Sequence, residues 1–172
     1  MRYGFPMSDA PTTTPEPPDP ISVATAYHEA GHAVVALELD RPVVKVSILP
    51  DRDRAGICHF GKAVTRPTED WIEREMLIAL AGLAAEARHT GTYDREAAGR
   101  DLRYARSLAT GRAGNARQAE RLERRMLSRV ENLLDTDNVW LAVERIAAEL
   151  LRQGEISGRQ ARHLYAECVR EK

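Results

Sequence analysis

No other segment limits the possible folds as strongly as the stretch from Ile21 to Leu39. It contains no proline, and the residues that recur at the spacing of one helix face are Ala24, His28, His32, Val35 and Leu39. The residues around the two histidines are small and apolar, which predicts that the helix is buried. The segment Asp40-Arg41-Pro42 ends it. We therefore expect a buried helix that carries polar side chains into the core.

The two histidines of this helix are four residues apart, in the pattern His28-Glu29-Ala30-Gly31-His32. Side chains at this spacing project from one face, so both imidazoles can reach a single metal ion. Glu29 lies about 100° further round the helix, beside the ion, where it can accept a proton from a metal-bound water. The pattern indicates metal-assisted peptide hydrolysis, with His28 and His32 as ligands and Glu29 as catalytic base. The alternative is a pair of histidines that form hydrogen bonds in the core and bind no metal.

The rest of the sequence predicts a small β-sheet followed by helices. Residues 43–49 are β-branched and mostly apolar, and residues 56–60 form a weaker strand candidate. Thr68 can cap a helix that has Glu69 and Asp70 in its first turn. Further helices are predicted over residues 96–109, 116–134 and 139–151, and from Ser157, where Ser157-x-x-Gln160 forms a capping box. The predicted fold class is α+β and predominantly helical, with a small β-sheet and a helical C-terminal half.

The distribution of proline divides the chain into two parts. Six of the nine prolines lie in residues 1–20, and such a segment buries too little apolar surface to offset its ordering entropy. We expect residues 1–20 to be a disordered Pro-rich tail. Residues 21–172 are expected to form one domain, long enough to bury a core.

Composition argues against several classes of partner. The formal net charge is −1, which gives no field that would attract nucleic acid or an anionic membrane. The longest uncharged run, residues 76–85, is half the roughly 20 residues that a membrane-spanning helix needs. Cys58 and Cys168 are far apart and in no paired motif, so we expect reduced thiols and a cytoplasmic protein. Gly56-x-x-x-x-Gly61-Lys62 imitates a phosphate-binding loop, but Ala63 replaces the Ser or Thr that would hold magnesium.

Several segments in one order resemble the peptidase domain of FtsH-type ATP-dependent zinc metalloproteases. The sequence of residues 27–36, Tyr-His-Glu-Ala-Gly-His-Ala-Val-Val-Ala, is similar to the active-site helix of that family, and the other matching segments are residues 44–50, 78–86 and 133–158. The resemblance implies a zincin-like active-site helix, bound Zn²⁺ and hydrolysis of peptide bonds. The family's AAA+ ATPase module and membrane helices are not found in this sequence, so we do not expect this chain alone to unfold substrates.

The resemblance also suggests a third metal ligand. The family uses an aspartate at the start of a later helix, within a Gly-Ala-x-Asn-Asp-Leu pattern, and this sequence has Ala97-Ala98-Gly99-Arg100-Asp101-Leu102. Asp101 is therefore the expected third ligand, although Ala97 and Arg100 replace the family's glycine and asparagine. The rival candidates are Glu86, His59 and His89, of which Glu86 is the best because it lies in a matching segment.

Taken together, the sequence predicts a zinc-dependent metallopeptidase that acts on flexible or unfolded polypeptides without ATP. The strand at residues 43–49 is expected to hold an extended substrate by β-augmentation. Tyr27 and Tyr104 are candidates for stabilising the oxyanion. The alternatives are a non-catalytic zinc-binding or interaction module derived from the same domain, and a helical scaffold without metal. A separate ATPase or self-association as a homo-oligomer stays open.

Overall fold

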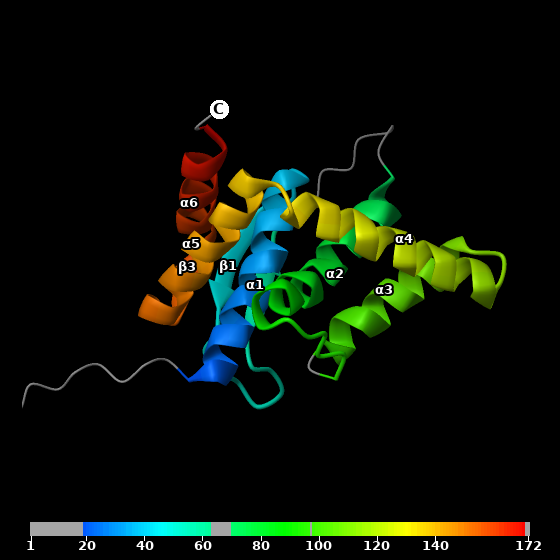
Figure 1. The fold of residues 1–172 in the computed structure, drawn as a ribbon, viewed down its shortest axis with the longest axis horizontal. Coiled ribbons are helices and arrows are strands. Elements are labelled where there is room, and N and C mark those ends of the chain that lie inside the picture. Colours follow the sequence, from blue (N-terminus) through cyan, green and yellow to red (C-terminus); the bar gives the residue numbers. More distant parts are fainter. Residues whose placement is uncertain (1–18, 63–69, 97, 171–172) are drawn as a thin grey trace, which may run out of the picture.

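The computed structural model describes residues 19–62, 70–96 and 98–170. Within these ranges the elements, in chain order, are α1 (Pro20–Glu38), β1 (Val43–Ser47), β2 (Ile57–Phe60), α2 (Trp71–Thr90), α3 (Gly99–Arg112), α4 (Ala116–Leu134), α5 (Asp137–Gln153), β3 (Glu155–Ser157) and α6 (Gly158–Arg170). The predicted α+β, predominantly helical fold is confirmed. In Figure 1, α3 and α4 lie side by side at one end of the molecule and α5 and α6 at the other, with α1 and α2 between them.

Helix α1 forms the centre of the core. Asp19 caps it by accepting a hydrogen bond from the Ser22 backbone N–H, and Pro20 occupies the first turn, where no N–H is needed. Both residues were predicted to belong to the tail, the rest of which lies outside the described residues. Nearly every residue from Ala26 to Ala36 is buried, as predicted, and α1 packs against both α2 and α5.

Small residues let α1 and α2 approach each other closely. A Cβ atom added at Gly31 would lie 2.5 Å from the Cβ of Ala85 and 2.6 Å from the backbone oxygen of Ala81. The alanine-rich middle of α2 thus packs directly against the backbone of α1 beside the two histidines. This packing places the residues of α2 that follow, Gly82 and Glu86, next to the histidine side chains.

The sheet has the strand order β2-β1-β3, and both pairings are antiparallel. β1 ends at Ser47, two residues earlier than predicted, and the backbone N–H of Ile48 donates to the Gly154 oxygen. β3, only three residues long, was not predicted. Because β1 is paired on both sides, the expectation that residues 43–49 hold the substrate by β-augmentation was wrong. On the side of β1 opposite β3 lies β2, and the outer edge of β2 pairs with no strand in the described chain.

Two helix starts test the predicted caps. Asp70 caps α2, because its side chain accepts a hydrogen bond from the Glu73 N–H at 3.2 Å. The predicted cap, Thr68, lies with Glu69 outside the described residues. At the start of α6 the Ser157 hydroxyl oxygen accepts from the Gln160 N–H at 3.2 Å, which is one half of the predicted capping box. The Gln160 side chain does not complete it but donates to Glu149 at 2.9 Å. None of the described helices is both long and apolar enough to cross a membrane.

Candidate metal centre

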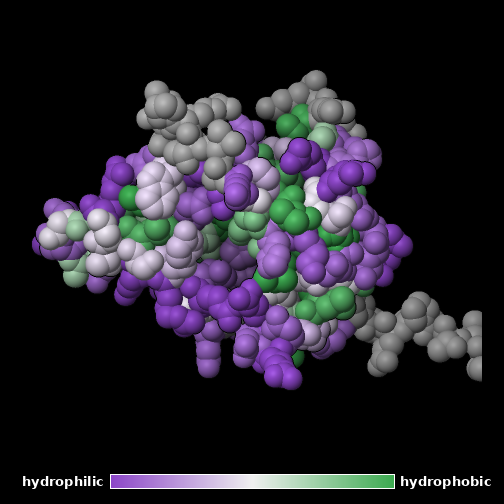
Figure 2. All heavy atoms as spheres, turned by 180° about the vertical axis from the view of Figure 1, so that it is seen from behind, coloured by the Kyte–Doolittle hydropathy of each residue, from purple (hydrophilic) through white to green (hydrophobic). Residues whose placement is uncertain are grey.

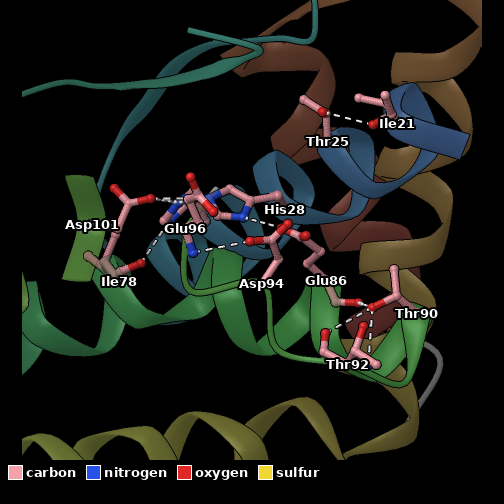
Figure 3. A network of polar contacts seen from close by, with 11 residues as sticks. Ile21, Thr25, His28, Ile78, Glu86, Thr90, Thr92, Asp94, Glu96 and Asp101 are labelled. Carbon is pink, nitrogen blue, oxygen red and sulfur yellow. Dashed lines mark hydrogen bonds and ion pairs between the residues drawn. The ribbon is translucent and has the colours of Figure 1, made fainter. Parts of the chain in front are cut away.

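Three side chains from two helices meet in one place. Nε2 of His28 lies 3.2 Å from Nε2 of His32, and Oδ2 of Asp101 lies 3.1 Å and 3.3 Å from these two nitrogens, respectively. The histidines come from α1, and Asp101 comes from the first turn of α3. Figure 3 shows His28 and Asp101 pointing toward one another. The structure thus brings together the three residues that the sequence predicted as metal ligands.

The dimensions of this triangle suit a tetrahedral metal ion. Ligand atoms about 2.0–2.1 Å from a tetrahedral centre stand about 3.3 Å apart, close to the three separations observed here. Two imidazoles and one carboxylate are also a typical donor set for catalytic zinc. Gly82 of α2 borders the triangle, and a Cβ at this position would lie 2.4 Å and 2.5 Å from the Nε2 atoms of His32 and His28. A glycine is therefore required where α2 passes the donors.

The other ring nitrogen of each histidine has an acceptor. Nδ1 of His28 lies 2.8 Å from Oε2 of Glu86, and Nδ1 of His32 lies 2.8 Å from the backbone oxygen of Ile78. A carboxylate and a carbonyl only accept, so each Nδ1 carries a proton, and each Nε2 points into the triangle, where a metal would replace any proton on it. Sequence reasoning considered Glu86 a rival ligand and missed this orienting contact.

The remaining rival ligands lie elsewhere. His89, at the end of α2, stacks on Tyr27 with ring centroids 3.7 Å apart. His59 is exposed on β2 and lines the same cleft as the donor triangle without belonging to it. Of the two oxyanion candidates, Tyr27 stacks with His89 and Trp140 and does not line the cleft, whereas Tyr104 of α3 does.

The carboxylates around the triangle favour positive charge on its histidines. Burial lowers the pKa of His28, but hydrogen bonds to Asp101 and Glu86 outweigh it and raise the pKa to about 10. Burial raises the pKa of the Asp101 carboxyl, but contacts with both histidines hold it well below its usual range. Two carboxylates beside His28 thus favour a positive charge at the triangle, as a bound cation would supply.

Glu29 lies beside the triangle. It is buried, and burial raises the pKa of its carboxyl, while the neighbouring His32 and His28 act in the opposite direction. Gly56, just before β2, faces it: a Cβ at Gly56 would lie 2.9 Å from Oε1 of Glu29. Glycine at this position therefore leaves the carboxylate room in the cleft.

The triangle opens into a cleft of about 810 Å³ lined by α1, α2, α3, β2 and the loop before β2. Edge strand β2 contributes all four of its residues to the wall. Seen from behind, the surface is mostly hydrophilic, with scattered hydrophobic groups and a recess near its middle (Figure 2). The site is thus a triangle of potential metal ligands in an open groove, bordered by β2, whose outer edge pairs with no strand among the described residues.

The model of peptidase family M41 matches residues 22–115, which is more than half of the chain. This chain belongs to peptidase family M41. His28, Glu29, His32 and Asp101 all lie in the matched range, and so do Gly82 and Glu86. The predicted resemblance to the FtsH-type peptidase domain is confirmed.

Named relatives of this M41 chain are ATP-dependent zinc metalloproteases. The chloroplastic FTSH of Medicago sativa is 32% identical over 111 residues, which cover 60% of this chain and 14% of the relative. The FtsH of Magnetococcus marinus is 40% identical over 94 residues, 49% of this chain and 13% of the relative. FtsH 2 of Alkaliphilus metalliredigens is 58% identical over 48 residues, 27% of this chain and 6% of the relative. The chain thus spans about one seventh of the length of these relatives or less.

Proposed function

We propose that this chain is a zinc-dependent metallopeptidase that hydrolyses peptide bonds in flexible or unfolded polypeptides. His28, His32 and Asp101 would hold the ion, and Glu29 would be the general base. The observation that carries the proposal is the donor triangle with sides of 3.1–3.3 Å, with the Glu29 carboxylate beside it in an open cleft. Zinc bound there would supply Lewis acidity, which lowers the pKa of the attacking water and polarises the substrate carbonyl.

In this proposal Glu29 moves the proton. Its carboxylate accepts a proton from the attacking water and then delivers it to the amine that leaves when the peptide bond breaks. Burial, which raises the pKa of Glu29, makes it a stronger base than an exposed carboxylate. Glu86 and the Ile78 carbonyl hold the histidine rings while this happens, because they accept from the Nδ1 atoms.

The substrate would lie along β2. This strand borders the cleft, and the backbone groups on its outer edge face no other strand among the described residues. An extended polypeptide can add to such an edge by main-chain hydrogen bonds, which do not depend on sequence. Only a flexible or unfolded segment can adopt this conformation, which is why we propose that class of substrate.

We also propose a partner and a cellular location for this protein. The relatives are named as ATP-dependent, and an ATPase acting with this domain would supply unfolded polypeptide to the cleft. Cys58 and Cys168 form no disulfide, in keeping with a reducing compartment, and we place the protein in the cytoplasm.

The experiment is cleavage of an unstructured peptide, without ATP, by wild type and Glu29→Gln. Glutamine fills the same volume but cannot take the proton, so cleavage should fall by about 10²–10⁴. Zinc content and melting temperature should stay close to those of wild type. Equal cleavage by both proteins would disprove the role of Glu29. A zinc-loaded wild type that cleaves no flexible substrate would instead favour the non-catalytic zinc-binding module.

A further inference from the structure

The hairpin of α3 and α4, which forms one end of the molecule in Figure 1, is strongly basic. Residues 99–134 contain nine arginines, no lysine and four carboxylates, which gives them a net charge of +5. The whole chain has a net charge of −1, so all other residues together carry −6. The near-neutral total therefore conceals a separation of charge, and the basic end can attract an acidic partner over about 8 Å at physiological salt.

Some of the arginines form ion pairs that fasten α4 to its neighbours. Arg125 and Arg129 lie 2.6 Å and 2.5 Å, respectively, from the two carboxylate oxygens of Glu73 on α2. Arg106 of α3 lies 2.8 Å from Oε1 of Glu123 on α4. These three arginines are neutralised within the fold, so they offer little charge to a partner.

Three other arginines form a line on the outer face of α4, which we call the arginine row. Arg117, Arg121 and Arg124 are exposed and have the i, i+4, i+7 spacing of one helix face. Among the described residues none of the three forms an ion pair, and Glu120, on the same side of α4, offsets only one charge. The row spans seven residues, or about 10 Å of helix. Carboxylates at the same spacing on a second helix, laid along α4, would face all three guanidinium groups.

A small apolar hollow, which we call the leucine pocket, adjoins the arginine row. Its volume is about 240 Å³, and its apolar lining consists of Leu80 and Leu83 of α2, Leu102 of α3 and Leu127 of α4. The two leucines of α2 are buried, whereas the other two are half-buried and border the opening. Arg124, the last residue of the row, also lines the pocket. The volume is below the roughly 300–1,000 Å³ of small-molecule sites and suits a single side chain.

These features favour a polypeptide over a nucleic acid or a lipid surface. Helix α4 contains no aromatic residue on which a base could stack. A membrane-binding helix presents its apolar face to lipid, whereas the apolar face of α4, which includes Met126 and Val130, is buried and packs against α2. A row of positive charges beside a pocket for one apolar side chain matches a peptide that carries both kinds of group.

We infer that the α3–α4 hairpin is a docking surface for an acidic helical segment of a partner protein. Carboxylates of that segment would lie along the arginine row, and one leucine-sized side chain would enter the leucine pocket. The residues of the row and of the pocket are not among the described residues that line the cleft. A docked partner would therefore hold polypeptide near the cleft without blocking it, and the inference does not depend on the proposed peptidase function.

Fluorescence anisotropy of labelled peptides, added to the full chain, tests this inference. The probe is a helical peptide of about 15 residues with glutamates at i, i+4 and i+7 and one leucine beside the last of them. One matched peptide has alanine for the leucine, and a second has glutamine for the glutamates. Wild type should bind the probe about tenfold more tightly than the alanine peptide, because the leucine side chain leaves water. It should bind the glutamine peptide about tenfold more weakly than the probe, because three ion pairs are lost.

Paired variants of the protein locate the binding surface. Arg121→Gln combined with Arg124→Gln should weaken binding of the probe about threefold to tenfold. The matched control is Arg159→Gln combined with Arg162→Gln, which removes the same charge from the exposed side of α6 at the other end of the molecule. The control should bind like wild type. Melting temperatures show whether each variant folds, and the comparison of peptides on wild type needs no variant.

Equal affinity of wild type for the leucine and alanine peptides overturns the inference, as does an equal loss of affinity in the two paired variants. Tighter binding of a DNA oligonucleotide or of phosphatidylglycerol vesicles, with the same dependence on Arg121 and Arg124, would assign the surface to nucleic acid or membrane instead. Self-association in analytical ultracentrifugation that is lost in the Arg121→Gln, Arg124→Gln protein would assign it to a second copy of this chain. Zinc-free protein should bind the probe like zinc-loaded protein, so failure to cleave peptides would overturn only the proposed catalysis.

Discussion

Nδ1 of His28 lies 2.8 Å from Oε2 of Glu86, a carboxylate 58 residues further along the chain, and both side chains are buried. This contact orients the imidazole so that Nε2 faces Nε2 of His32 and the Asp101 carboxylate. In the proposed metal centre, Glu86 would therefore act through His28 and not as a ligand. The first prediction tests this distinction.

Removing Glu86 should weaken zinc binding without abolishing it. Loss of a hydrogen-bond partner behind a histidine ligand typically lowers metal affinity by about 10–100-fold. Glu86→Ala should show this loss in competition with a chromogenic chelator, and Glu86→Gln a smaller one, because the amide oxygen still accepts from Nδ1. Glu96→Ala, which removes another acid of the cleft, is the control and should bind zinc like wild type. Asp101→Ala should lose more affinity than Glu86→Ala; the reverse order would make Glu86 the third ligand.

The purified chain should hold about one zinc ion, as expected for a single three-ligand site. Because the ion binds the folded state, free zinc at 1,000 times its dissociation constant stabilises the fold by about 4 kcal/mol, or about 8–16 °C in melting temperature. Elemental analysis and thermal melts with and without chelator measure both quantities. His28→Ala should melt at the same temperature in both conditions. Zinc-independent melting of wild type would contradict the site.

Gly82→Ala should abolish zinc binding at little cost to helix formation. The new Cβ would lie 2.4 Å from Nε2 of His32 and 2.5 Å from Nε2 of His28, so the imidazoles must move away from the triangle. The control is Gly111→Ala, the same change in α3, where no atom lies within 4 Å of the added Cβ. The control should retain one zinc per chain. Full zinc occupancy in Gly82→Ala, by elemental analysis, would rule out this geometry.

Gly31→Ala should destabilise the fold itself. Its Cβ would meet the Ala85 Cβ at 2.5 Å and the Ala81 backbone oxygen at 2.6 Å, so α1 and α2 must separate. Overpacking of this kind costs about 1–3 kcal/mol, which urea unfolding measures as a lower midpoint. Gly111→Ala should instead gain about 0.5–1 kcal/mol, because alanine favours a helix. Equal stability of Gly31→Ala and wild type would contradict the close packing.

Short-range interactions account for the features that were predicted correctly. The spacing of His28 and His32 places both on one face of α1 whatever surrounds the helix, because the period is set by backbone hydrogen bonds. Helix α4 has the predicted bounds, residues 116–134, since its apolar residues recur at helical spacing and Asn115 caps it. The motif and its flanking segments also sufficed to predict the family.

Long-range packing decides the rest. Asp101 reaches His28 across 73 residues, and the sequence could suggest this ligand only through a family resemblance. The role of Glu86 depends on the close approach of α2 to α1, which buries its carboxylate against one particular ring nitrogen. The prediction that β1 holds the substrate was wrong. β3 is too short to show a periodic pattern in the sequence, so it was not predicted, yet its pairing covers the second edge of β1. A local pattern specifies which way a side chain points on its own element, but which elements meet depends on how the whole core packs.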